Sequence, residues 1–156
     1  MHVEQPELFR GLDAEATAKV VLLGRRVTLT PDGVLFTLGD QADEVFIVER
    51  GRILLTIPMR FGTRQELVAI EERRPGQIVG WSALIHPHRF TLSARALVDS
   101  ELLAIPRVAL VSHMEQEPSV GYCIARNLAS VVGHRLQVFE AMWLREMQRA
   151  VAHRYA

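Results

Sequence analysis

The chain of 156 residues, 49% hydrophobic and 23% charged, is about one domain long and can form a core without disulfide bonds. Its 18 basic residues are balanced by 18 acidic ones, which excludes the basic excess expected of a protein that binds nucleic acid directly. No apolar run approaches the roughly 18 residues that cross a bilayer, and a polar N-terminus with one cysteine, Cys123, predicts a cytoplasmic protein.

Residues 6–23 are predicted to form short N-terminal helices. Leu8, Leu12, Ala16 and Val20 recur at the spacing of one helix face, and Asp13 can cap a helical turn. The hydrophobic period changes after residue 24, where apolar and polar residues begin to alternate.

Residues 25–105 are predicted to form about eight short strands, with turn signals every 8 to 12 residues or so. The clearest unit is a hairpin in which Arg50-Gly51 joins strands at residues 44–49 and 52–57. The other strands are expected at residues 27–29, 34–38, 66–70, 77–80, 90–97 and 101–105. This pattern predicts a mainly β fold with flanking helices, in which the strands form a double-stranded β-helix (jelly-roll) barrel.

Residues 106–155 are predicted to be helical. A short helix begins with Pro106, and Pro118 opens a longer helix over residues 118–152 that must project beyond the barrel. An apolar stripe steps along this helix by threes and fours, and a second copy of the chain is its simplest partner. The alternative is that the helix folds back on its own barrel. The predicted dimer interface consists of Leu128, Val132, Leu136, Phe139 and Trp143.

Three segments resemble, in sequence and in order, the cyclic-nucleotide-binding domain family, in the form found in bacterial transcription regulators of the catabolite activator type. They are residues 39–51, residues 75–80 and residues 95–107. The first of them has a glycine, a short loop and a strand that ends in a glycine turn. The resemblance implies one sensor domain over residues 1–156. No helix-turn-helix follows the long helix, so we expect a domain without its own DNA-binding part and without direct contact to nucleic acid.

The resemblance also implies a phosphate-binding cassette, a short helix after Gly80 whose backbone amides suit an anion. Family members that bind cyclic nucleotides place a glutamate for the ribose after this glycine, and an arginine for the cyclic phosphate about nine residues later. Here Trp81 and Phe90 occupy these two positions, and Arg89 could serve only if the preceding loop shortens or bulges. The predicted ligand-binding residues are Gly80, Trp81, Ser82, Ala83, Arg89, Phe90 and Thr91.

These departures predict a sensing domain with a degenerate cassette that takes a non-standard small anionic ligand or none. Trp81 is either a plug that fills the vacated site or a platform for a ligand. One alternative is a true receptor for cyclic AMP or cyclic GMP that uses Arg89. Another is a metal-dependent cupin enzyme that uses His86 and His88, although the metal motif is incomplete. We expect no catalytic residue, no metal and no cofactor, and the sequence does not identify a protein partner.

Overall fold

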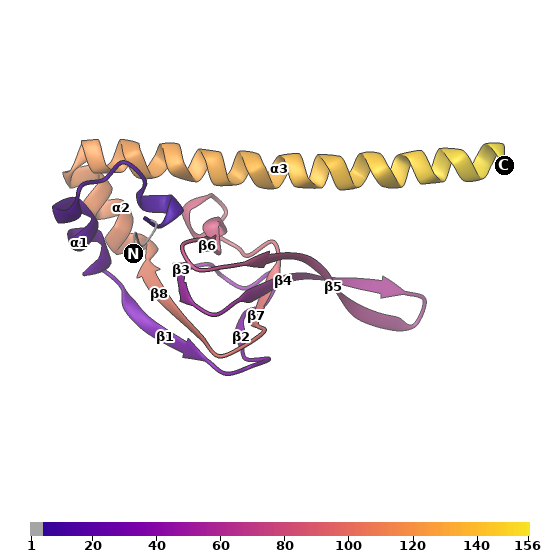
Figure 1. The fold of residues 1–156 in the computed structure, drawn as a ribbon, viewed down its shortest axis with the longest axis horizontal. Helices are drawn as coiled ribbons and strands as arrows, with labels where there is room; N and C mark the ends of the chain where they lie inside the picture. The colour runs from indigo at the N-terminus through magenta and orange to yellow at the C-terminus, as the bar shows by residue number, and fades with distance from the viewer. Residues whose placement is uncertain (1–4) are drawn as a thin grey trace.

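The computed structural model describes residues 5–156 and contains two antiparallel four-stranded sheets, with two shorter α-helices at one end and a long helix along one side (Figure 1). Residues 1–4 begin the polar N-terminus from which a cytoplasmic protein was predicted, and they lie outside the described residues. The strands are β1 (Arg25–Leu29), β2 (Val34–Phe36), β3 (Glu44–Arg50), β4 (Ile53–Phe61), β5 (Arg64–Arg73), β6 (Ile78–Val79), β7 (Ser93–Ala96) and β8 (Ser100–Pro106). The helices are the 3-10 helix η1 (Glu7–Phe9), α1 (Ala14–Val21), the 3-10 helix η2 (Trp81–Leu84), α2 (Arg107–Gln116) and α3 (Pro118–Tyr155).

The eight strands form an open pair of sheets, where the sequence predicted a barrel. One sheet has the order β1-β8-β3-β6 and the other the order β2-β7-β4-β5, and within residues 5–156 no strand of one sheet pairs with a strand of the other. A closed barrel needs a continuous hydrogen-bonded ladder around its circumference. Two short edge strands interrupt it here, because β6 has two residues and β2 has three, with a register shift between Val34 and Phe36.

The core draws on both sheets and on the first part of α3. Buried side chains at residues 45–48, 53, 55, 94, 96 and 102–105 form one cluster with residues of the helices. Asn127 of α3 donates from its amide nitrogen to the backbone oxygens of Leu8 (2.8 Å) and Arg10 (2.9 Å). These buried hydrogen bonds fix the first part of α3 against η1 and the residue that follows it.

The element boundaries agree with the sequence in outline and differ at three points. Asp13 caps α1 as predicted, with its carboxylate accepting from the Ala16 amide at 2.8 Å. The short helix begins at Arg107, because Pro106 is still paired with Glu44 at the end of β8. Residues 62–63 make the only turn between β4 and β5, so both strands are longer than expected.

The third difference concerns Phe90, which lies before β7 and not in a strand. The backbone of Phe90 hydrogen-bonds with the loop after β2: its amide donates to Asp40 (3.0 Å), and its carbonyl accepts from Gly39 (2.8 Å). The chain therefore enters the sheet only at Ser93. This loop pairing decides which way residues 89–91 face.

The long C-terminal helix is confirmed as α3, whose 38 residues span about 57 Å at 1.5 Å per residue. Figure 1 shows that α3 runs along one side of the sheets and extends beyond them, and the β4–β5 hairpin projects in the same direction. Within the described part of the chain, no helix combines the length and apolar character that a bilayer crossing requires.

Candidate functional site

Gly80 holds the first turn of η2 in a conformation that favours glycine. Its φ is +76°, and a Cβ at this position would lie 2.9 Å from Cε1 of Phe90 and 3.2 Å from Cε1 of Phe36. Both a left-handed backbone and close aromatic neighbours therefore select glycine here. The turn places the cassette helix directly over a layer of phenylalanine rings.

Phe90 occupies the space beneath the cassette. Its ring stacks on that of Phe36 with centroids 3.7 Å apart and planes 4° from parallel, and Phe36 lies 6.0 Å from Phe46. All three rings are buried. The ring of Phe90 is thus packed against other aromatic rings of the core.

The cavity that remains beneath η2 is small, about 20 Å³. A void of this size holds about one water molecule. Five of the seven predicted ligand-binding residues line it, namely Gly80, Trp81, Ser82, Phe90 and Thr91. Ala83 is fully buried in the core cluster and its amide donates to the Gly80 carbonyl at 3.1 Å. These residues therefore lie together around η2, and the structure leaves little room for a ligand between them.

Arg89 is the seventh predicted residue, and the structure places it outside this cavity. Its side chain is exposed and donates from Nη1 to the Gly39 carbonyl at 2.9 Å. The backbone of Arg89 also forms an isolated bridge with Gln41. Use of Arg89 for a ligand requires the loop before Phe90 to bring the guanidinium under the cassette. In the structure the loop does not do so.

A different arginine, Arg135 of α3, borders the corner. It lines the small cavity together with Ser82 and Thr91, and it is only 7% exposed. Its Nε lies 2.9 Å from Oε2 of Glu71 in β5. Burial lowers the pKa of Arg135 below its ordinary value; the charge of Glu71 opposes that effect, and the charge of Arg73 adds to it.

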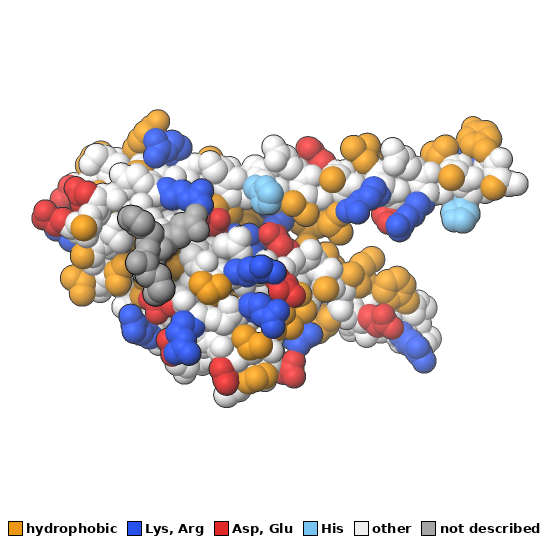
Figure 2. Space-filling view, in the orientation of Figure 1, with side chains coloured by type: hydrophobic (Ala, Val, Ile, Leu, Met, Phe, Trp, Pro, Cys, Tyr) orange, Lys and Arg blue, Asp and Glu red, His pale blue; other side chains and the backbone are white. Residues whose placement is uncertain are grey.

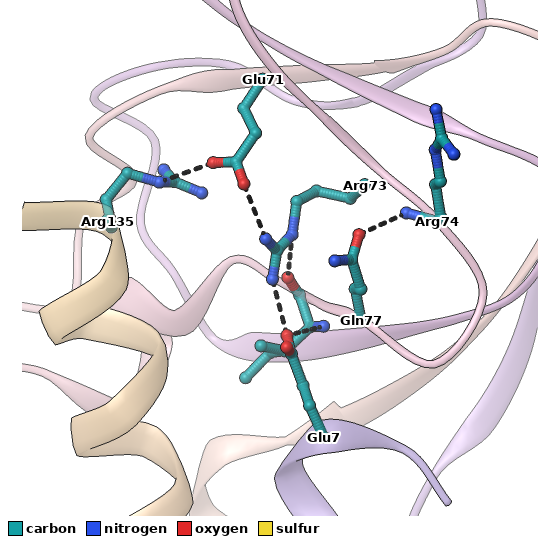
Figure 3. Close-up of polar contacts among 7 residues, drawn as sticks. Glu7, Glu71, Arg73, Arg74, Gln77 and Arg135 are labelled. Carbon is teal, nitrogen blue, oxygen red and sulfur yellow. Dashed lines mark hydrogen bonds and ion pairs between the residues drawn. The ribbon is translucent and has the colours of Figure 1, made fainter. Parts of the chain in front are cut away.

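Arg135 belongs to a network of four charges that joins α3, β5 and η1 (Figure 3). Glu71 contacts both Arg135 and Arg73, which donates to Oε1 of Glu71 at 2.9 Å and to Oε1 of Glu7 at 2.6 Å. Arg73 also donates from Nε to the Ile78 carbonyl at 3.0 Å. Two guanidinium groups and two carboxylates thus balance in a largely buried position, which such charges require.

Sequence reasoning missed Arg135 because it followed a different face of α3. The buried positions of this helix include residues 120, 124, 127 and 131, which step by fours and threes, and the next such step falls on Arg135. The stripe chosen from the sequence, residues 128 to 143, is a neighbouring face. A buried helical stripe that ends on an arginine was the available signal.

A second and larger cavity of about 320 Å³ lies between the cassette and α3. Apart from Thr91 and Arg135, its lining is apolar, and four residues line both cavities: Trp81, Thr91, Leu92 and Arg135. The full lining is Ile57, Trp81, Thr91, Leu92, Val132, Arg135, Leu136 and Phe139. Three of these residues, Val132, Leu136 and Phe139, were assigned from sequence to the dimer interface.

That predicted interface passes from half-buried to exposed along α3. Leu128 and Val132 are half-buried, whereas Phe139 is 36% and Trp143 62% exposed. The β4–β5 hairpin adds further exposed apolar side chains, Met59, Phe61 and Leu67. Figure 2 shows hydrophobic side chains along this hairpin and where α3 leaves the sheets.

His86 and His88 do not assemble a metal site with other described residues. Their ring centroids are 5.9 Å apart in an edge-on arrangement, and Nδ1 of His88 lies 3.0 Å from the Ala83 carbonyl. Residues 5–156 contain no group of three or more histidine, cysteine or acidic side chains placed to hold an ion. A cupin-type centre needs a carboxylate and a further histidine beside this pair.

Comparison with known families gives one match along the chain. A family model described as the cyclic nucleotide-binding domain matches residues 26–117, which include all eight strands except the first residue of β1. A search of curated proteins finds no significant match.

Solved structures of similar fold cover most of the chain. The catabolite activator protein of Thermus thermophilus is 25% identical with a TM-score of 0.72, and the match covers 90% of this chain and 62% of that one. The N-terminal domain of a transcriptional regulator from Streptomyces coelicolor A3(2) is 25% identical with a TM-score of 0.70, covering 85% of this chain and 91% of that one. A cyclic nucleotide-binding domain from Methylobacillus flagellatus KT, 16% identical with a TM-score of 0.75, covers 85% and 74%.

Proposed function

The chain belongs to the cyclic nucleotide-binding domain family, and we propose that it is a small-molecule-sensing regulatory domain whose cassette does not bind cyclic nucleotides in the usual way. The observation that carries this proposal is the Phe36–Phe90 stack, 3.7 Å between centroids, which leaves about 20 Å³ beneath η2. A cyclic nucleotide would have to displace a buried ring to enter. The proposal assigns a binding role in the cytoplasm and no catalytic residue.

The chemistry of the two exchanged positions supports the same conclusion. Trp81 and Phe90 stand where the family resemblance implies a carboxylate for the ribose and a guanidinium for the cyclic phosphate. Neither aromatic side chain can form the charge-assisted hydrogen bonds that such groups supply. Each contact to a charged group contributes about 1.5–3 kcal/mol, so two absent contacts weaken binding by about two to four powers of ten.

The alternative of a cyclic-nucleotide receptor that uses Arg89 has less support. The guanidinium already donates to the Gly39 carbonyl, and the side chain is exposed. To reach the cassette, residues 89–91 would have to give up the hydrogen bonds that Phe90 makes with Gly39 and Asp40. A ligand must repay that rearrangement from its own binding energy.

Isothermal titration calorimetry with cyclic AMP and cyclic GMP tests the closed cassette. We expect no saturable binding at ligand concentrations up to about 1 mM, a free energy weaker than about −4 kcal/mol. The variant Arg89→Ala is the informative control, since micromolar binding that is lost in Arg89→Ala would establish the alternative receptor. Such binding would refute the closed cassette.

We propose further that the domain acts as a homodimer through Leu128, Val132, Leu136, Phe139 and Trp143 of α3. The support is the exposed apolar surface on the projecting part of the helix, which a single chain leaves in water. Two such helices side by side would bury it in the manner of a coiled coil. The cavity of about 320 Å³ between the cassette and α3 then adjoins the dimer interface, so a ligand there can bias the position of the helices.

Sedimentation velocity tests the dimer. We expect the unaltered protein to sediment with twice the monomer mass, and Trp143→Glu together with Phe139→Glu to give monomer because a charge cannot be buried in the seam. The control is Gln137→Glu, which adds one negative charge at an exposed polar position on the opposite side of α3. A monomeric unaltered protein would refute this part of the proposal.

A further inference from the structure

Arg135 is a buried cation whose donors are incompletely used. Within residues 5–156 its only close partner is Glu71, which it contacts through Nε, and the side chain is 8% exposed. Among residues 5–156, neither of its terminal nitrogens donates a hydrogen bond to another side chain or to the backbone. A guanidinium has five N–H donors, so the terminal nitrogens of Arg135 can bind an anion in addition to the contact with Glu71.

Arg135 borders a cavity of suitable size and polarity. Arg135 lines the hollow of about 320 Å³ between the cassette and α3, which is near the lower limit for small-molecule sites. Three lining residues carry polar groups: Arg135, Thr91 and Trp81. The remaining lining is aliphatic or aromatic, so one charged end and one apolar body are what this cavity can accommodate.

We propose that this cavity binds a singly charged carboxylate bearing an aromatic or branched apolar group. The carboxylate accepts hydrogen bonds from the terminal nitrogens of Arg135, in the forked geometry that a guanidinium offers to two oxygens. The apolar group lies against Trp81, Leu92 and Phe139. This inference rests on the proposed sensing function and gives that function a ligand class and a binding residue outside the cassette.

The surrounding charges favour one negative charge over two. Arg135 and Arg73 are already balanced by Glu71 and Glu7. A ligand therefore adds its own charge to a neutral network, and Glu71 repels a second negative charge. A phosphate monoester or dicarboxylate is disfavoured for this reason, and a monocarboxylate is accommodated.

The position of the cavity gives the ligand a means of acting on α3. Val132, Leu136 and Phe139 belong both to the cavity lining and to the proposed dimer seam. A ligand that fills the cavity contacts three seam positions and the cassette together. Its binding energy then depends on where α3 lies relative to the sheets, which couples occupancy to helix pose.

Nuclear magnetic resonance titration of the native protein tests the ligand class. The probes are benzoate, phenylacetate and hydrocinnamate, each compared with its neutral amide, and the reporter is the indole N–H signal of Trp81. The protein has two tryptophans, so Trp143 on the projecting part of α3 is an internal control. We expect at least one acid to shift the Trp81 signal more than that of Trp143, with affinity at least about tenfold above that of its amide.

Variants then test the binding residue. Removing Arg135 alone would leave Glu71 partly uncompensated, so the test uses Arg135→Met with Glu71→Gln, which removes both members of the pair. We expect this double variant to remain folded and to lose at least about tenfold of its affinity for the acid, with no change for the amide. The exposed Arg145→Gln on the same helix should bind as the native protein does.

Three results would overturn the inference: no acid shifts Trp81 at about 10 mM, acid and amide bind equally, or the folded double variant binds like the native protein. Should the double variant fail to fold, the acid–amide comparison on the native protein still decides. Failure of these probes together with failure of cyclic AMP to bind would overturn the ligand class and leave the closed cassette intact. Tight binding of cyclic AMP would overturn the proposed function itself.

Discussion

The cassette and the part of α3 that faces it differ in whether they place a buried cation beside the cavities. On the sheet side, Trp81 and Phe90 are aromatic, and Arg89 faces solvent and the Gly39 carbonyl. On the helix side, Arg135 is buried, lines both cavities and is fixed by Glu71. The cassette thus has no buried cation of its own, and α3 supplies one beside it.

The largest effect is expected on the sheet side, at Phe90. Phe90→Ala removes a ring stacked on Phe36 and leaves a cavity beneath η2. We expect the free energy of unfolding to fall by about 3–5 kcal/mol, as measured by urea denaturation. Phe61→Ala, at an exposed ring in the β4–β5 hairpin, should change it by about 0.5 kcal/mol or less. Equal costs at the two positions would show that Phe90 is not packed into the core.

On the helix side, Glu71→Gln is expected to cost about 3 kcal/mol, because it leaves the guanidinium of Arg135 buried without its carboxylate. Adding Arg135→Met to that variant removes the stranded charge, so the total cost should drop to about 1 kcal/mol or less. The measurement is a double-mutant cycle by chemical denaturation. If the two substitutions were additive, the Arg135–Glu71 contact would not hold α3 to β5.

Alanine substitutions at two glycines, Gly80 and Gly39, distinguish the cost of a left-handed backbone from the cost of crowding in the cassette. Gly80 and Gly39 both have positive φ, +76° and +91°, but a Cβ on Gly39 would have no neighbour within 4 Å. Both alanine variants should lose about 1–2 kcal/mol for the left-handed conformation. Gly80→Ala should lose at least about 1 kcal/mol more, because its Cβ meets the rings of Phe90 and Phe36. Thermal unfolding of both variants supplies the comparison, and equal losses would mean that the rings yield freely.

The smallest effect is expected at Arg89. Its side chain is exposed and makes one hydrogen bond to a backbone carbonyl. Arg89→Gln should therefore change the free energy of unfolding by about 0.5 kcal/mol or less. A loss near that of Glu71→Gln, measured under the same conditions, would show that Arg89 is part of the corner after all.

Local sequence signals were enough to place most of the fold. Turn residues and alternation located the strands, and Asp13 located the start of α1. The family resemblance placed the cassette after Gly80 and identified Trp81 and Phe90 as exchanged positions. The dimer interface and the ligand stay predictions.

What the sequence did not disclose are contacts between distant segments. Glu7 and Arg73 are 66 residues apart, and Arg135 meets Glu71 from another element, so no local spacing signals either pair. The direction of Arg89 depends on hydrogen bonds between Phe90 and the loop at Gly39, which a strand prediction over residues 90–97 does not include. The two sheets do not close into the predicted barrel because the edge strands β2 and β6 are short, and the sequence pattern did not indicate those lengths.

The most direct test of the closed cassette is a crystal structure of the protein grown with saturating cyclic AMP. We predict that the Phe36 and Phe90 rings stay stacked at about their present separation of 3.7 Å, with no nucleotide beneath η2. A Phe90 ring displaced from Phe36, with a cyclic phosphate bound in its place by Arg89, would contradict the account.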